Sequence, residues 1–309
     1  MSLLQKTTSP IDGSLYVQRD QAEQGQIDTA LLAARQAQKD WQNTSLTERK
    51  AFCSAAVKIL VDNKEAIAEE ICWQMGRPIR YAGGELNSLA ERAEYMISIA
   101  DDALAPLQQA EKSGFIRYIK RVPVGVVLVI APWNYPLHTP INAIVPALLA
   151  GNTIIVKHSS QTPLSAERIC QAFADAGLPH GVLQCLHMGH NATETLVASG
   201  QVNHVAFTGS VAAGRKIETA AAGQFIGVGL ELGGKDPAYI RADADLNYAV
   251  ESTVDGAFFN SGQSCCGLER IYVHESIYDA FLHDFVALTK KYILGRPDHA
   301  TTTLGPLVR

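Results

Sequence analysis

The strongest constraint on the fold of this chain is a regular alternation of apolar runs and helix-like segments between residues 126 and 230. The run at 126–130 is apolar throughout and rich in β-branched residues, as expected of a parallel strand covered on both faces. Further apolar runs occur at 153–156, 182–186, 202–207 and 226–230, each separated by a segment of helical pattern. Strands and helices that alternate with short links form right-handed crossovers. We therefore predict an α/β fold with a doubly wound, five-stranded parallel sheet.

Residues suited to ligand binding follow several of these strands. In doubly wound sheets, ligands bind at the carboxyl ends of the strands. We therefore expect one rim of the sheet to gather Trp133, Asn134, Lys157, Gly189, Thr208, Gly209 and Ser210. The Gly-x-Gly-x-x-Gly fingerprint is absent after the first strand, but the segment 209–214, which ends at Gly214, places a glycine turn and a hydroxyl at a helix start. Such a start favours phosphate, although an ordinary N-cap explains it equally well.

Two adjacent thiols, Cys265 and Cys266, lie in a run of small and polar residues at 260–267. A thiol in a polar pocket can act as a nucleophilic thiolate. Most free cysteines are small buried hydrophobes, so the pair alone favours a structural role. Asn134 could stabilise an oxyanion, although asparagine in a loop usually forms a turn. Glu231 follows an apolar strand directly, where it is either a solvated strand end or a base that activates water.

Four motifs taken together favour a catalytic role for these residues over a structural one. They are Pro132-Trp133-Asn134-Tyr135-Pro136, Phe207-Thr208-Gly209-Ser210, Glu231-Leu232-Gly233-Gly234-Lys235 and Asn260-Ser261-Gly262-Gln263-Ser264-Cys265. In this order and at these spacings they resemble the successive signatures of the aldehyde dehydrogenase superfamily. The resemblance covers essentially the whole chain, and the set is specific although each motif alone is weak.

The resemblance implies a function and a role for each motif. Cys265 matches the nucleophile, Asn134 the oxyanion-stabilising amide, and Glu231 the general base. Thr208, Gly209 and Ser210 match the turn beside nicotinamide and pyrophosphate, and Trp133, Lys157 and Gly189 match cofactor-wall and ribose positions. The implied reaction oxidises an aldehyde to a carboxylic acid with NAD or NADP through a cysteine thiohemiacetal and a thioester.

Ser160 departs from the family pattern, because many NAD-preferring relatives have an acidic residue at this position. Loss of that charge relieves repulsion of a 2′-phosphate, which Lys157 could then bind. We therefore predict that Lys157 and Ser160 allow NADP, and we hypothesise that it is preferred.

The resemblance also implies a domain organisation. We assign 1–113 and 124–234 to the cofactor-binding domain, 114–123 to the hairpin of an oligomerisation arm, and 235–309 to an incomplete catalytic domain. Relatives continue beyond this length, so we expect a truncated chain whose full-length version is a homo-oligomer. An inactive fragment that binds only nucleotide or a homologue is therefore an alternative. A CoA-acylating enzyme is another alternative, against which Glu231 argues.

The N-terminal region has a helical pattern to which we assign no chemistry. Helices are expected near 27–41, from a capping box at Ser45-Leu46-Thr47-Glu48, up to Met75 with Gly76 as the stop, and over 85–104. An exposed strand is expected at 114–121, and a helix cap at Thr139-Pro140. After the sheet we expect a helix at 242–258, a strand at 270–273 and a helix at 277–288.

The composition argues against several other classes of protein. Lys and Arg are dispersed and the net charge is −5, so nothing suggests a nucleic acid or an anionic membrane as a partner. The N-terminus lacks a signal-peptide core, and no apolar run reaches membrane-spanning length. The six cysteines have neither metal-ligand nor disulfide-framework spacing. We expect a soluble cytoplasmic protein that acts on a small-molecule aldehyde and holds no metal.

Overall fold

The computed structural model describes residues 3–309, and its centre is the predicted five-stranded parallel sheet. The strands are β5 (Val126–Ile130), β6 (Thr153–Lys157), β7 (Leu183–Cys185), β8 (His204–Thr208) and β9 (Gly227–Glu231). Their order across the sheet is β7-β6-β5-β8-β9, and every neighbouring pair is parallel. The order reverses direction at β5, so the loops after β5 and β8 diverge there to leave a ligand crevice. The predicted fold class is confirmed.

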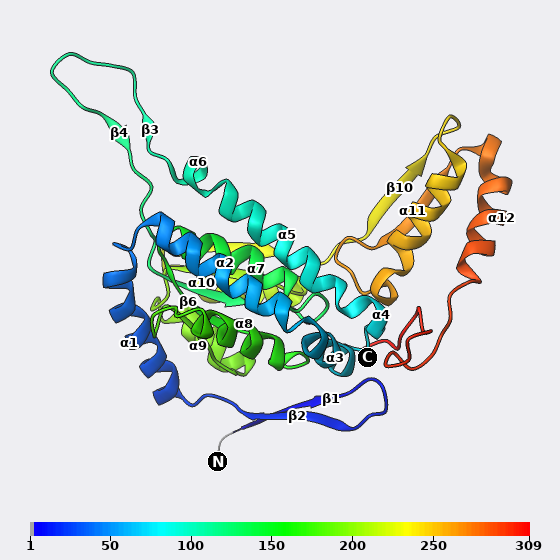
Figure 1. Cartoon of the computed structure of the whole chain (residues 1–309), viewed down its shortest axis with the longest axis horizontal. Coiled ribbons are helices and arrows are strands. Elements are labelled where there is room, and N and C mark those ends of the chain that lie inside the picture. The colour runs from blue at the N-terminus through cyan, green and yellow to red at the C-terminus, as the bar shows by residue number, and fades with distance from the viewer. Residues whose placement is uncertain (1–2) are drawn as a thin grey trace.

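Helices cover both faces of this sheet (Figure 1). Residues of alternating parity on β5 point to opposite faces, so Val127 and Val129 belong to one core and Val126 and Leu128 to the other. The first core contains residues of α2 (Leu46–Asp62), α3 (Lys64–Met75), α5 (Gly84–Ser98), α7 (His138–Leu149) and α8 (Pro163–Asp175). The second contains residues of α1 (Gln24–Trp41), α9 (His190–Ala198) and α10 (Val211–Ala221). Burial on both faces explains the uninterrupted apolar character of β5 and β6.

The N-terminal helices follow their sequence signals closely. Ser45 and Glu48 form the capping box at the start of α2, and α3 ends where Gly76 takes a left-handed conformation with φ of 81°. The helical pattern over 85–104 is divided into α5 and α6 (Ala100–Leu104), and α4 (Ile79–Ala82) precedes them. An antiparallel hairpin of β1 (Leu4–Thr8) and β2 (Leu15–Asp20) was not predicted, because its short strands are weakly patterned.

A second, exposed hairpin projects from the body of the molecule (Figure 1). The strand expected over 114–121 is much shorter, because only β4 (Tyr118–Ile119) pairs, antiparallel, with β3 (Leu107–Gln108). The loop between them exposes large apolar side chains, including Phe115 and Ile116. Exposure of this kind on a projecting hairpin is typical of a surface that another chain covers.

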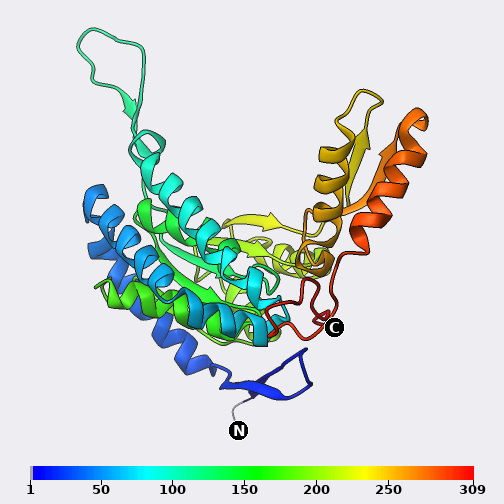
Figure 2. The same ribbon diagram turned by 45° about the vertical axis from the view of Figure 1, so that its right-hand side comes forward.

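The residues after the sheet form a separate α/β unit (Figure 2). Its strands β10 (Asp236–Ile240) and β11 (Leu268–Val273) are parallel, and α11 (Leu246–Phe258) and α12 (Tyr278–Thr289) pack on them. Two short 3₁₀ helices, η1 (Phe259–Gly262) and η2 (Glu275–Ile277), complete the unit. The sequence analysis missed β10, whose first half is polar, and placed the start of α11 too early, since Asp245 caps that helix. Among residues 3–309, every helix is too short or too polar to span a membrane.

Candidate active site

The Asn134 loop, residues 131–137, connects the carboxyl end of β5 to α7 and is anchored from the neighbouring strand. His158 follows β6 and is buried, and its Nε2–H donates to the carbonyl oxygen of Pro136 at 2.7 Å. The hydroxyl of Thr162 donates to Nδ1 of the same ring at 3.2 Å. Both ring nitrogens are therefore used by the neutral tautomer, and burial lowers the pKa of His158 to about 4. The loop that carries Asn134 is thus held at the rim of the sheet.

The helix cap predicted at Thr139-Pro140 is wrong, because α7 begins at His138 and no side chain of its own segment caps it. Its first N–H groups are instead bound by a carboxylate from another helix. Oε1 of Glu85 accepts hydrogen bonds from the amides of Leu137 and His138 at 2.7 and 2.9 Å. A negative charge at a helix N-terminus also interacts favourably with the helix dipole.

The Cys265 loop, residues 259–267, begins with an unusual turn. Asn260, Ser261 and Gly262 are all left-handed, with φ values of 53°, 58° and 72°. Glycine adopts this conformation readily and asparagine tolerates it, so the backbone of Ser261 carries most of the strain. Such strain persists when surrounding contacts over-determine the backbone. The turn leads directly to Cys265 and Cys266, which are both exposed free thiols.

Asn134 lies against this loop. Its side-chain Nδ2 donates to the carbonyl oxygen of Gln263 at 3.1 Å, and its Oδ1 accepts from the amide of Tyr135 at 3.1 Å. The second hydrogen bond defines which atom of the carboxamide is nitrogen. The ring of Tyr135 stacks on Phe259 with centroids 6.3 Å apart and an interplanar angle of 17°. The amide proposed to stabilise an oxyanion is therefore bound to Gln263, which precedes the proposed nucleophile, Cys265, by two positions in the chain.

The segment that begins with Glu231 contacts the Cys265 loop through its backbone. Glu231 ends β9, where it pairs with Thr208, and its carbonyl oxygen accepts from the amide of Gly209 at 3.0 Å. Three residues further on, Gly234 lies against the Cys265 loop, because a Cβ on it would be 2.5 Å from the carbonyl oxygen of Cys265. A side chain at that position would push the two segments apart. The structure thus brings together the segments of all three predicted catalytic residues.

The thiol of Cys265 is a proton-bearing group in this state. Partial burial of the sulfur and the adjacent Cys266 raise its pKa above the ordinary cysteine value. The sulfur of Cys266 lies 3.3 Å from the hydroxyl of Ser264. The thiolate form of Cys265 is therefore less populated at neutral pH than that of an ordinary cysteine.

Lys157 is the clearest candidate for a ligand contact on the rim. It ends β6 and is only 6% exposed, and its side-chain ammonium has no hydrogen-bond or ion-pair partner among residues 3–309. Burial lowers the pKa of its ammonium. An unpaired buried cation is costly unless a partner joins it, so this residue fits a hydroxyl or phosphate group of a nucleotide.

The other predicted cofactor residues surround the same rim. Gly189 is the N-cap of α9, and Ser160 lies exposed after β6, with its carbonyl oxygen accepting from Thr7 at 2.7 Å. Trp133 is half-buried and packs against the core cluster that includes α7.

The glycine turn after β8 forms the expected helix start. Ser210 is the N-cap of α10, and its hydroxyl accepts from the amide of Ala213 at 3.3 Å, so the N-cap interpretation applies. Gly209 packs closely on Phe207, and a Cβ on Gly214 would be 2.6 Å from Leu232. Gly214 therefore allows α10 to approach the segment after Glu231, and the amides of the first turn remain the groups suited to phosphate.

A scan against protein-family models matches residues 3–309 to the aldehyde dehydrogenase family. The chain belongs to this family. Among curated relatives, it is 34% identical over 301 residues to the NADP(+)-dependent D-glyceraldehyde dehydrogenase of Thermoplasma acidophilum, a match that covers 97% of this chain and 61% of the relative. The chain thus spans about 61% of the length of that aldehyde dehydrogenase.

Solved structures of this family are also similar. PnpE from Pseudomonas sp. WBC-3, solved with NAD, has a TM-score of 0.94 at 35% identity, covering 98% of this chain and 63% of that one. A 3,6-anhydro-L-galactose dehydrogenase solved with NADP has a TM-score of 0.93 at 32% identity, covering 99% and 65% respectively. Both match the aldehyde dehydrogenase fold described above.

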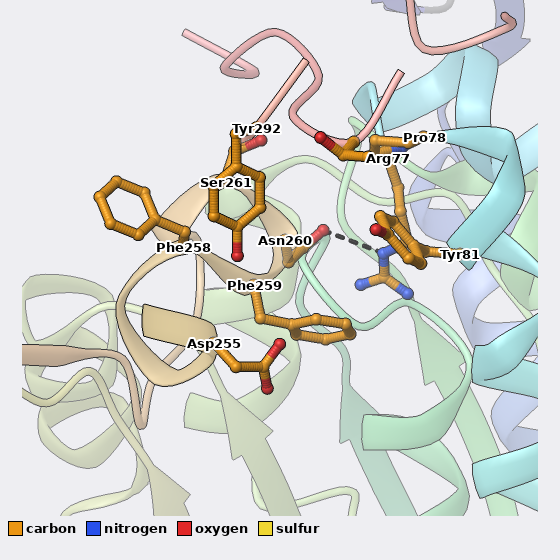
Figure 3. Close-up of a pocket in the computed structure, with 10 residues that line it drawn as sticks. Arg77, Pro78, Tyr81, Asp255, Phe258, Phe259, Asn260, Ser261 and Tyr292 are labelled. Carbon is orange, nitrogen blue, oxygen red and sulfur yellow. Dashed lines mark hydrogen bonds between the residues drawn. The ribbon is translucent and has the colours of Figure 1, made fainter. Parts of the chain in front are cut away.

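Two buried charged residues of this aldehyde dehydrogenase chain were missed in the sequence analysis. Arg77 and Glu85 lie in the N-terminal region, to which no chemistry was assigned, yet Arg77 contacts both site loops. The signal was available, because Glu85 shares the apolar face of α5 with Leu86 and Leu89. A small cavity of about 90 Å³ adjoins Arg77 (Figure 3). Its lining includes Tyr81, Asp255, Phe259, Asn260 and Tyr292.

Proposed function

We propose that this chain carries the active site of an NAD(P)-dependent aldehyde dehydrogenase, in which Cys265 is the nucleophile that converts an aldehyde to a carboxylic acid. One observation carries the proposal. The segment with Asn134 and the segment with Glu231 both contact the Cys265 loop, through the Asn134–Gln263 hydrogen bond and the packing of Gly234 on Cys265.

In the first step, the exposed thiol of Cys265 loses its proton to solvent, and the thiolate sulfur attacks the carbonyl carbon of the aldehyde. The carbonyl oxygen gains negative charge, which needs hydrogen-bond donors. The Nδ2 of Asn134 carries two hydrogens, and one of them is used by Gln263. The second is available to the oxyanion, together with the main-chain N–H of Cys265.

The second step removes a hydride from the thiohemiacetal and leaves a thioester on Cys265. The residues at the rim fit a dinucleotide, since Lys157 is a buried cation whose ammonium has no partner in the described part of the chain, and α10 offers the amides of a helix N-terminus. A nicotinamide nucleotide held by these residues would supply the hydride acceptor. The carboxylate of Glu231 then removes a proton from water, which releases the acid from the thioester.

We further propose that NADP is accepted and preferred over NAD. The exposed Ser160 puts no negative charge beside Lys157, so a 2′-phosphate meets attraction without repulsion. The relatives described above include one named as NADP(+)-dependent and one solved with NADP.

The domain boundaries proposed from the sequence fit the same function. Residues 1–113 and 124–234 would hold the cofactor, 235–309 would supply the nucleophile, and 114–123 would belong to an arm that joins subunits of a homo-oligomer. The exposed apolar residues of the β3–β4 hairpin support the arm. The six free thiols support a reducing compartment such as the cytoplasm.

The test measures NADPH or NADH formation by the purified chain with a panel of aldehydes, alongside nucleotide binding by calorimetry. Aldehyde-dependent reduction that is lost in Cys265→Ser and kept in Cys266→Ser supports the proposal. Nucleotide binding without any turnover would favour the alternative of a chain that only binds nucleotide. Turnover that requires added CoA would favour acyl transfer to CoA.

A further inference from the structure

Arg77 connects the two loops that form the proposed active site. Its Nε donates to Oδ1 of Asn260 at 2.9 Å, which places it on the left-handed turn of the Cys265 loop (Figure 3). Its Nη2 donates to the carbonyl oxygen of Asn134 at 2.5 Å. The guanidinium also lies over the ring of Tyr135, 4.7 Å from the centroid. A single side chain from the link between α3 and α4 therefore contacts both loops.

Glu85 fixes the orientation of this guanidinium. Nη1 of Arg77 forms an ion pair with Oε2 of Glu85, and the two side chains are only 2% and 0% exposed. The other carboxylate oxygen is bound by the amides of Leu137 and His138, at the start of α7. The guanidinium is planar and its donors point in fixed directions, so this pairing determines where Nε and Nη2 point.

Asn260 depends on Arg77 for its own position. Its Nδ2 donates to the carbonyl oxygens of Asn134 and Gln263 at 3.1 and 3.2 Å, while its Oδ1 accepts from Arg77. Asn260 is buried and has a φ of 53°. Without the arginine, a buried oxygen loses its donor and the strained turn loses a contact that holds it.

We propose that Arg77, held by Glu85, is a positioning residue that sets the distance between the Asn134 amide and the Cys265 sulfur. The inference rests on the proposed function, because it assigns Arg77 a role in that reaction. If Arg77 served only to neutralise the buried Glu85, the ion pair between them would suffice. Arg77 also binds both the Asn134 loop and the Cys265 loop, which a positioning role requires.

The main test is Arg77→Lys, which keeps the charge but loses the rigid fork of donors. We expect kcat for aldehyde oxidation to fall about 100-fold, since a displacement of about 1 Å can cost that much. KM for the nucleotide should stay within about threefold, because no nucleotide contact changes. Glu85→Gln, which keeps an acceptor for the α7 amides, should lower kcat about 10-fold and provides the test if Arg77→Lys does not fold.

A readout that does not need turnover follows the loops directly. Hydrogen exchange of the amides at 134–138 and 260–266 should be at least about 10-fold faster in Arg77→Lys or Glu85→Gln. The matched control is Phe173→Leu, at a fully buried position of α8 in the main core, which lowers stability without removing a hydrogen bond from either loop. It should lower the melting temperature but leave kcat and the loop exchange unchanged.

The outcomes separate this inference from the proposed function. Unchanged kcat and unchanged loop exchange in both Arg77→Lys and Glu85→Gln would overturn the positioning role. The positioning role would also be overturned if Phe173→Leu and Arg77→Lys lowered the melting temperature equally and changed kcat and loop exchange to the same extent. Faster loop exchange in a chain that oxidises no aldehyde would leave the loop positioning intact while the proposed function fails.

Discussion

The side-chain amide of Asn134 donates a hydrogen bond to the carbonyl oxygen of Gln263 at 3.1 Å, although 129 residues separate them in the sequence. This contact holds the proposed oxyanion donor against Gln263, which precedes Cys265 by two positions in the chain. It also uses one of the two hydrogens on the amide nitrogen and leaves the second for the oxyanion of the proposed mechanism. In that mechanism, the same nitrogen contributes to both loop packing and transition-state stabilisation.

Asn134→Ala should lower kcat by about 100- to 1,000-fold, the usual effect of losing one oxyanion donor. Steady-state assays with a saturating aldehyde measure it. Asn142→Ala, on α7 beyond the loop, removes an amide of the same size that bonds Arg92, and it should retain full activity. An active Asn134→Ala enzyme would remove this residue from the mechanism.

Alkylation of Cys265 by iodoacetamide should rise with pH to a midpoint above the ordinary cysteine value, because burial and Cys266 raise its pKa. The thiolate fraction at neutral pH is correspondingly low. Cys266→Ser should move the midpoint down and speed alkylation at pH 7. Mass spectrometry identifies the modified residue, and a midpoint at or below the ordinary value contradicts the assignment.

Glu231→Gln should stop the reaction at the thioester. A single burst of reduced nucleotide, close to one per site, should precede steady-state turnover that is about 100- to 10,000-fold slower than wild type. Glu218→Gln, at an exposed position on α10, is the matched control and should behave as wild type. Steady-state turnover that Glu231→Gln leaves unchanged argues against activation of water by this carboxylate.

Lys157→Met should weaken NADP binding about 10- to 100-fold, the value of one charge-assisted hydrogen bond, and should affect NAD less. Ser160→Glu should reverse the preference towards NAD, because its carboxylate repels a 2′-phosphate. Calorimetric titration with each nucleotide measures both changes. Lys39→Met, an exposed lysine of α1, serves as the control. Equal losses for the two nucleotides would refute a phosphate contact.

The stability of the fold should fall on acidification because His158 is neutral and buried. Its folded pKa of about 4 lies below the ordinary value of 6.5, so the unfolded chain binds the proton first between these values. Stability is therefore complete above pH 6.5 and declines towards pH 4, by about 2 kcal/mol from this group at pH 5.

Urea unfolding of His158→Gln should show a smaller decline between pH 7.5 and pH 5 than the wild type. Glutamine keeps a donor for the carbonyl oxygen of Pro136 but does not titrate. His283→Gln, at an exposed position on α12, should follow the wild-type curve. Identical pH dependence in wild type and His158→Gln would show that this ring does not stay neutral.

Local sequence patterns predicted those elements that are marked by a continuous apolar run or by capping residues. The all-apolar β5, the capping box at Ser45 and Glu48, and the glycine stop at Gly76 each lie where the sequence analysis placed them. The β1–β2 hairpin and β10 were missed, because short half-polar strands differ little from loops in periodicity.

The sequence by itself determined the parallel sheet, the family, and the residue types offered for chemistry. Only the tertiary structure decided which of them meet. Glu85 shares a helix face with apolar residues and Arg77 follows the glycine stop of α3, but neither position predicts that the two side chains meet. In the structure they are buried between α3, α5 and the loops that follow β5 and α11. Periodicity encodes which face of an element is buried, whereas contacts over more than a hundred residues depend on the packing of whole layers. That packing brings Arg77, Asn134 and Asn260 to one point.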